Sequence, residues 1–300
     1  MRDRKSVSYH YDIGNNFYRL FLDDEMIYSC AYFVLGNETI DEAQQKKMDY
    51  ICRKLRLKKN DKFLDIGCGW GGLIIFAAEN YGVNSTGITI SKEQYELVCQ
   101  RIEERGLRQK CTVQLFDYRR LKNEHKKYDK IASIGMIEHV GLKRLQGYFQ
   151  VIHDVLKNEG LFLNHGITTR RVKKRRGTGS AFMDKCIFPD AELINASYIS
   201  QQAEEKGFEL LDIESLRRHY AKTLECWTRR LEMNSKEAIQ IAGEKTYRTW
   251  LLYLAGCCNV FRSGEVNVYQ MLMAKSNHGL EGVGLTRDEL YRQNDLIRKI

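Results

Sequence analysis

The stretch KFLDIGCGWGG, residues 62–72, decides the fold of this 300-residue chain. A short apolar strand stops at Asp65, glycines occupy positions 67, 69, 71 and 72, and the helical run LIIFAAENY follows directly. Glycine lets the backbone approach a ligand closely, and the N–H groups at the start of a helix point toward it. The stretch therefore predicts a strand, a turn and a helix that together hold a nucleotide-like cofactor.

Strand-like and helix-like segments alternate along the chain. Strands are expected at 62–65, 83–89, 110–116, 128–135, 160–168, 209–216 and 266–275, and helices at 39–57, 91–105, 142–157, 190–206, 221–233 and 235–261. This alternation predicts an α/β fold, a seven-stranded, mostly parallel sheet with helices on both faces and a helical substrate cap. We expect one domain over residues 1–275, made of an N-terminal lid (1–60), a core (61–168) and a cap insertion (169–262), followed by a polar tail (276–300).

Ligands in such sheets bind at the edge where the carboxyl ends of the parallel strands meet. Several residues of the expected sheet lie at or just past such ends, namely Asp65, Thr89, Asp117, Gly135 and His165. We expect these residues to gather around the ligand.

Two classes of cofactor fit the glycine turn. The pattern GxGxxG of dinucleotide-binding folds fits at residues 67–72, but those folds place a carboxylate after the second strand. That position is GITIS here, residues 87–91, so Thr89 and Gln94 would have to supply the polar contacts. After the third strand, Asp117 can accept from an adenine amine and the ring of Tyr118 can cover the base. The pattern DxGCGxG resembles motif I of S-adenosylmethionine-dependent methyltransferases, and the missing carboxylate favours that cofactor.

The composition, 43% apolar and 29% charged, is typical of a globular protein. No apolar run approaches the ~18 residues that span a bilayer, and the N-terminus lacks the apolar core of a signal peptide, so we predict a cytoplasmic protein. The nine cysteines show no spacing typical of zinc, so we expect reduced thiols and no metal. The net charge of 48 − 39 = +9 favours nucleic acid or an acidic membrane surface as partner, although a solvated basic surface explains it equally.

The run RRVKKRR, residues 170–176, concentrates basic side chains in one expected surface insertion. Nucleic acid or lipid headgroups could bind this run, or it could be exposed to solvent without a partner. No aromatic–basic stacking motif accompanies it, so no nucleic acid is expected as a partner.

The opening segment, residues 9–33, is dense in aromatic side chains. Phe17, Leu20 and Phe21 fall at helical spacing and predict a short amphipathic helix. Either this segment is a hydrophobic lid over the core, or it covers the mouth of the cofactor pocket and lines an apolar substrate channel.

Seven segments together resemble the cyclopropane-fatty-acyl-phospholipid synthase and mycolic acid cyclopropane synthase family. They are HYDIGNNFYRLFLD, MIYSCAYF, LDIGCGWGG, GITISKEQ, SIGMIEHVG, HYAKTLECW and YLAGCCNVFRSGEVNVYQ. The matching segments cover most of the chain from Tyr9 to Lys275, and most lie outside the generic methyltransferase pattern. The resemblance implies a Rossmann-like class I methyltransferase fold and the short architecture of the mycolic type.

The resemblance also implies the site residues. Cofactor contacts fall on Tyr28, Ser29, Asp65, Gly67, Cys68, Gly69, Trp70, Gly71, Thr89, Ser91, Gln94, Asp117 and Tyr118. Arg119 departs from the family pattern, because some members carry an acidic residue there. Family members hold a bicarbonate ion in the active site, and the matching positions are Cys30 and Ile167 through their backbone, with Glu138, His165 and Tyr220. We expect Glu138 to orient a protonated His165 or to accept from the bicarbonate hydroxyl.

The implied reaction is S-adenosylmethionine-dependent cyclopropanation of cis double bonds in unsaturated phospholipid acyl chains, by way of a carbocation that bound bicarbonate deprotonates. An acyl-chain methyltransferase that leaves a methyl branch and a small-molecule amine N-methyltransferase remain alternatives. The expected partner is unsaturated acyl chains at an anionic membrane surface. The protein would associate peripherally with the inner face of the membrane, as a monomer or homodimer.

Overall fold

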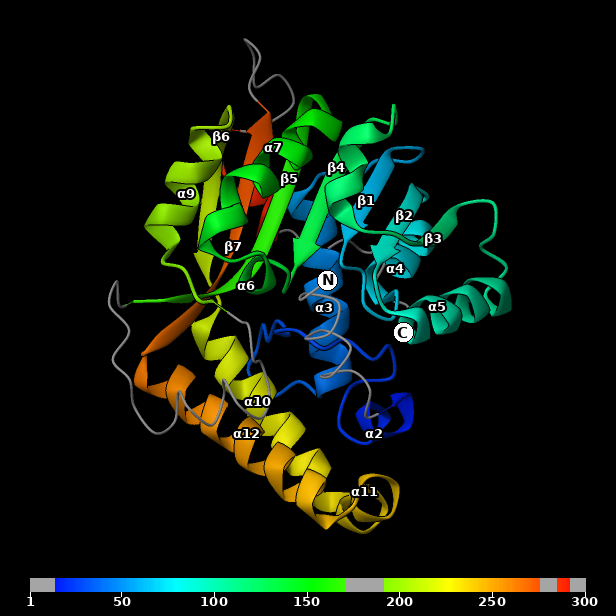
Figure 1. Ribbon diagram of the computed structural model, residues 1–300, viewed down its shortest axis with the longest axis vertical. Helices are drawn as coiled ribbons and strands as arrows, with labels where there is room; N and C mark the ends of the chain where they lie inside the picture. Colours follow the sequence, from blue (N-terminus) through cyan, green and yellow to red (C-terminus); the bar gives the residue numbers. More distant parts are fainter. Residues whose placement is uncertain (1–13, 171–191, 276–284, 292–300) are drawn as a thin grey trace.

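A seven-stranded sheet forms the centre of the computed structural model, which describes residues 14–170, 192–275 and 285–291 (Figure 1). The strand order is β3-β2-β1-β4-β5-β7-β6, and β7 alone runs antiparallel to its neighbours. The strands are β1 (Lys62–Ile66), β2 (Asn84–Thr89), β3 (Cys111–Leu115), β4 (Tyr128–Ile134), β5 (Leu156–Thr169), β6 (Phe208–Ser215) and β7 (Val266–Lys275). The predicted seven-stranded, mostly parallel sheet is confirmed.

Helices cover both faces of the sheet, because successive side chains of a strand point to opposite faces. On the face that receives Phe63 pack α3 (Ile40–Lys54), α4 (Gly72–Tyr81) and α5 (Lys92–Glu104). On the face that receives Leu64 pack α6 (Ile137–Val140), α7 (Leu145–Val155) and α9 (Ala196–Glu204). Asp65 follows on the strand and therefore lies on the α3 side, at the carboxyl edge of the sheet.

A third apolar cluster joins the opening segment to the cap. It combines α2 (Asn15–Arg19) with α10 (Arg217–Met233), α11 (Ser235–Ala242) and α12 (Glu244–Ser263). Phe17 and Tyr18 pack edge-on against Trp250, with ring centroids 5.7 and 5.4 Å apart. In Figure 1 this layer lies below the ends of β1 and β4, so the aromatic lid and the cap together cover the carboxyl edge.

Several expected boundaries are wrong, including the start of α10, which lies at Arg217 and not at residue 221. The single helix expected over 235–261 is broken at Gly243, whose φ of +81° ends α11 and precedes α12. The helix expected from Asp190 begins at Ala196 instead, where the side chain of Asn195 accepts from Tyr198 N. β5 begins at Leu156, earlier than expected, directly after α7.

The polar tail is described only over 285–291. There Arg287 pairs with Asp212 of β6, and Tyr291 of α13 (Asp288–Tyr291) lies against Tyr50 of α3, with ring centroids 6.1 Å apart. This part of the tail therefore packs on the domain. The basic run 170–176 lies, apart from Arg170, outside the described residues.

None of the helices within the described ranges is long and apolar enough to cross a membrane.

Candidate active site

The glycine turn, residues 66–72, carries the chain from β1 into α4. Gly67 has φ +81°, which side-chain-bearing residues rarely adopt, and a Cβ there would lie 2.6 Å from Cγ of Met136. Gly71 has φ +84° at the start of α4. The N–H groups of Gly67 and Cys68 both donate to the carbonyl of Ile88, which fixes the turn against β2. The turn therefore depends on glycine at these two positions.

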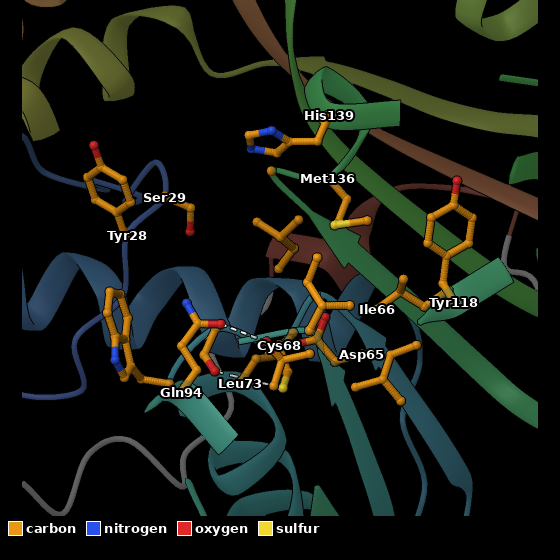
Figure 2. Close-up of a pocket in the computed structure, with 18 of the residues that line it drawn as sticks. Tyr28, Ser29, Asp65, Ile66, Cys68, Leu73, Gln94, Tyr118, Met136 and His139 are labelled. Carbon is orange, nitrogen blue, oxygen red and sulfur yellow. Dashed lines mark hydrogen bonds between the residues drawn. The ribbon is translucent and has the colours of Figure 1, made fainter. Parts of the chain in front are cut away.

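A cavity opens at the glycine turn, at the carboxyl ends of β1, β2 and β4, and we call it the cofactor pocket (Figure 2). It gathers most of the predicted cofactor residues, although they come from five parts of the chain. Those that line it are Tyr28, Ser29, Asp65, Gly67, Cys68, Gly69, Trp70, Thr89, Gln94, Asp117 and Tyr118.

Gly71 and Ser91, which were also predicted to contact the cofactor, do not line the pocket. A Cβ on Gly71 would lie 2.8 Å from Val98 of α5, so this glycine allows α4 and α5 to pack closely. The hydroxyl of Ser91 accepts from Gln94 N and caps α5. Both residues shape the pocket wall by holding helices in place.

The end of the pocket beyond β2 and β3 is polar and internally paired. Thr89 Oγ1 donates to Gln94 Oε1 at 2.7 Å. Asp117, expected to accept from an adenine amine, accepts from the backbone N–H and guanidinium of Arg119. The ring of Tyr118 lies edge-on to Tyr148 at 5.6 Å. Arg119, which stands where some family members carry an acidic residue, therefore holds the Asp117 carboxylate in place.

Asp65 lies at the centre of the pocket wall in Figure 2. Its carboxylate is buried, and Oδ1 has no hydrogen-bond partner within the described parts of the chain. Burial raises the pKa of Asp65 to about 7, opposed by the charge of Lys47. A buried polar atom without a partner is costly unless a ligand pairs with it. The glycine turn and this carboxylate fit S-adenosylmethionine, which carries an ammonium group at its amino-acid end.

A second polar group, the carboxylate–histidine corner, consists of Glu138, His165, Ile167 and Gln270. Glu138 Oε1 accepts from the Ile167 N–H at 2.6 Å, and Gln270 Nε2 lies 3.2 Å from His165 Nδ1. With the Gln270 amide nitrogen as the donor, Nδ1 accepts and neutral His165 carries its proton on Nε2. Glu138 Oε2 and His165 Nε2 are buried, and neither has a partner among the residues that the structure describes.

Burial sets the charge state of this corner. It raises the pKa of Glu138 to about 7 and lowers the pKa of His165 well below its usual value, to which Lys47 and Lys54 also contribute. At neutral pH His165 is therefore uncharged, and Glu138 keeps its proton to a much higher pH than an exposed glutamate does. The expected pairing of Glu138 with a protonated His165 is not what the structure shows, because the carboxylate bonds to the backbone of Ile167.

Cys30 and Tyr220 are connected through the start of α10. The thiol of Cys30 lies 3.7 Å from the Leu216 carbonyl, which also accepts from the N–H of Tyr220 at 2.9 Å. The ring of Tyr220 packs on Phe261 at 4.6 Å. The charge of Lys47 acts on both Cys30 and His165, so this lysine lies near both parts of the predicted bicarbonate site.

Some pocket residues were not predicted from the sequence. Met136 and His139 lie in the segment SIGMIEHVG but were not among the predicted contacts, and Figure 2 shows both side chains at the pocket. Arg144 also lines the pocket. Lys47 stands in the run QQKKMD, where nothing distinguishes it from the exposed lysines of other helices. A helical-face count on α3 would have placed Lys47 with Met48 and Ile51 on the buried side.

Comparisons with known proteins identify the family. The family model of mycolic acid cyclopropane synthetase matches residues 1–271. A probable fatty acid methyltransferase of Pseudomonas putida is 47% identical over 97% of this chain and 74% of its own length. Cyclopropane mycolic acid synthase 1 of Mycobacterium tuberculosis is 36% identical over 90% of this chain and 96% of its own.

Solved structures give the same result. A mycolic acid cyclopropane synthase crystallised with S-adenosylhomocysteine and CTAB superposes with a TM-score of 0.84 at 35% identity, covering 91% of this chain and 98% of that one. The fold, the glycine turn and these matches together show that the chain belongs to the mycolic acid cyclopropane synthetase family of S-adenosylmethionine-dependent methyltransferases.

Proposed function

We propose that this enzyme cyclopropanates cis double bonds in unsaturated phospholipid acyl chains, with S-adenosylmethionine as the source of the methylene carbon. The observation that carries the proposal is the carboxylate–histidine corner. Its two unpartnered atoms, Glu138 Oε2 and His165 Nε2, are buried, while Ile167 beside them packs against the aromatic layer of the lid and cap. A buried polar site bordering an apolar layer suits a reaction in the middle of a lipid chain.

Tyr28 links the cofactor pocket to that aromatic layer. It lines the pocket, its ring lies 5.2 Å from Trp227 of α10, and its hydroxyl is 3.3 Å from the hydroxyl of Tyr253. An alkene is a weak nucleophile, so exclusion of water and alignment of the double bond with the methyl donor must supply much of the acceleration. Aromatic faces also stabilise the positive charge that develops on the acyl chain.

The corner fits a bound bicarbonate. When bound, bicarbonate supplies a small base that takes the proton released as the ring closes. His165 would hold the anion through its Nε2–H, and protonated Glu138 would donate through Oε2, because a raised pKa leaves that carboxyl able to donate near neutral pH. The donor role of Glu138 replaces the orienting role, since a neutral carboxyl does not repel an anion.

A methyltransferase that leaves a methyl branch is the second candidate. The relative from Pseudomonas putida, 47% identical, carries the name probable fatty acid methyltransferase. Both products require the same cofactor, the same apolar environment and the same positive charge on the acyl chain. They differ only in where the last proton is lost, so the same corner would serve either outcome.

We further propose that the enzyme reaches its acyl chains at an anionic membrane surface on the inner face of the membrane, as a monomer or homodimer. The formal net charge of +9 favours such a surface. Binding to anionic vesicles should then weaken as salt screens the charges, with little binding to neutral vesicles.

One incubation tests the proposal. The protein is mixed with S-adenosylmethionine labelled in the methyl group and vesicles of unsaturated phospholipid, and the acyl chains are analysed by mass spectrometry. Both products are heavier by one methylene, so the methyl label distinguishes them. The expected cyclopropane chains lose one of the three methyl hydrogens as the ring closes. Branched chains that keep all three would favour the second candidate. Label that enters only small amines or RNA would contradict both.

A further inference from the structure

Lys47 is a buried cation in the wall of the cofactor pocket. It comes from α3, its residue is 2% exposed, and it lines the pocket beside Ser29 and Asp65. Its Nζ donates to the hydroxyl of Ser29 at 2.9 Å. An ammonium group has three donors, and this is the one hydrogen bond that it makes to the described residues.

The surroundings leave the charge of Lys47 incompletely compensated. No carboxylate in the described part of the chain lies within 4.0 Å of its Nζ, and Asp23 and Asp65 act on it only through space. Burial lowers the pKa of Lys47 to about 8, and both carboxylates oppose that shift. A buried ammonium with spare donors is costly unless a ligand completes its coordination.

The position of Lys47 matches one end of the cofactor. The amino-acid end of S-adenosylmethionine is a zwitterion with one carboxylate and one ammonium. The wall offers a cation and a hydroxyl from Lys47 and Ser29, and a carboxylate from Asp65 whose Oδ1 is unpartnered within the described chain. Figure 2 shows Ser29 and Tyr118 on opposite sides of Asp65, so the pairing lies away from the proposed adenine end.

The other basic side chains that line the pocket suit this task less well. Arg119 is already paired with Asp117 at the opposite end. Arg144 is exposed to solvent just before α7 begins. Lys47 is therefore the buried cation best placed for an anionic group of the ligand.

We propose that Lys47, together with Ser29, binds the α-carboxylate of the cofactor and so fixes the methyl group relative to the acyl chain. This inference rests on the proposed use of S-adenosylmethionine. It makes Lys47 a binding residue of the cofactor pocket, in addition to the residues that the motifs supplied.

A pair of ligands isolates this contact. Isothermal titration calorimetry would measure binding of S-adenosylhomocysteine and of its decarboxylated analogue, which keeps the amine and lacks the carboxylate. Lys47→Met should weaken binding of S-adenosylhomocysteine about 10- to 100-fold, the range for a hydrogen bond between charged groups. Binding of the analogue should change less than about twofold, because the analogue has no carboxylate to lose.

Two further variants keep the test decisive. Lys46→Met removes the neighbouring lysine of α3, which pairs with Glu38 outside the pocket, and should leave the ratio of the two affinities unchanged. Ser29→Ala, like Lys47→Met, should weaken binding of S-adenosylhomocysteine more than binding of the analogue. It therefore tests the same contact if Lys47→Met does not fold. Thermal unfolding of each variant checks folding independently.

Three outcomes would overturn the inference. An equal loss for both ligands in Lys47→Met would make Lys47 a structural residue only. A wild-type protein that binds both ligands equally would show that the carboxylate is not recognised. A wild-type protein that binds neither ligand would overturn the proposed function and this inference with it, whereas the first two leave the proposed function standing.

Discussion

The glycine turn and the carboxylate–histidine corner both lie at the carboxyl edge of the sheet. Buried polar atoms without partners in the described chain occur at both, on Asp65 just before the turn and on Glu138 and His165 in the corner. They differ in how the chain makes them. The turn consists of consecutive residues, and Gly67 and Gly71 set its path by their positive φ angles. The corner joins α6, β5 and β7, so that Glu138 meets Ile167, and His165 meets Gln270 from more than a hundred residues away.

The turn can be recognised from a short stretch of sequence, whereas the corner cannot. Local backbone geometry fixes where a cofactor can approach, so a short motif suffices to identify the turn. The corner depends on strand register: β5 and β7 pair antiparallel with His165 opposite Gln270, and the corner exists only when that pairing is correct. We therefore expect damage to the turn to appear in cofactor binding and damage to the corner to appear in turnover.

The largest expected effect is on turnover at the corner. Glu138→Leu should lower kcat about 100-fold or more, because leucine can neither accept from the Ile167 N–H nor donate to a bound anion. Affinity for S-adenosylhomocysteine should stay within about twofold, since Glu138 does not line the cofactor pocket. His165→Gln and Tyr220→Phe should show the same pattern. Steady-state kinetics with vesicles and calorimetry measure the two quantities, and a comparable loss of cofactor affinity would break the comparison.

The next effect is on cofactor binding at the turn. Gly67→Ala should weaken binding of S-adenosylhomocysteine about 10-fold or more, because alanine is strained at φ +81° and its Cβ would meet Met136 at 2.6 Å. Gly147→Ala is the matched control. Gly147 lies within α7, and a Cβ added there would meet no atom within 4 Å, so alanine should leave binding unchanged. Equal losses in both variants would argue against the role of the turn.

A third effect, in the pH dependence of stability, should be alike in the two regions. Asp65 and Glu138 each have a pKa raised to about 7 by burial, so the folded chain keeps protons that the unfolded chain releases at lower pH. The free energy of unfolding should therefore fall as pH rises from 5.5 to 8, by about 2 kcal/mol for each group. Urea unfolding of Asp65→Asn and of Glu138→Gln at both pH values tests this.

Each of these two substitutions should flatten the pH dependence by a similar amount. If only one variant does so, the two buried carboxyls are not equivalent. A nearby charge must then hold down the pKa of the carboxyl whose substitution has no effect. Lys47 is the candidate partner on the side of Asp65, because its charge opposes the shift there.

The smallest effect concerns a residue that supports the pocket from outside. Ser91→Ala removes the cap of α5 and should cost about 1 kcal/mol of stability. Cofactor affinity should stay within about twofold, because Ser91 does not line the pocket. Asn195→Ala removes the corresponding cap of α9, which carries no pocket residue, and should cost a similar amount. A large loss of affinity in Ser91→Ala alone would return Ser91 to the set of cofactor contacts.

Much of the fold follows from local sequence signals. Alternating strands and helices predicted the sheet, and the helix expected from residue 39 agrees with α3, whose start carries a capping box of Thr39 and Glu42. The break at Gly243 was missed because an isolated glycine is compatible with a helix, and its positive φ is decided by how α11 packs on α12.

The sequence alone determined that a glycine turn would bind a cofactor at the edge of a parallel sheet, because φ angles and side-chain periodicity are local properties. Tertiary structure decided the rest of the site. It paired the Asp117 carboxylate with Arg119 and placed the Glu138 carboxylate where it accepts from the Ile167 N–H. It also buried Lys47 in the pocket wall. Burial and pairing depend on which distant segments meet, and long-range packing alone determines that.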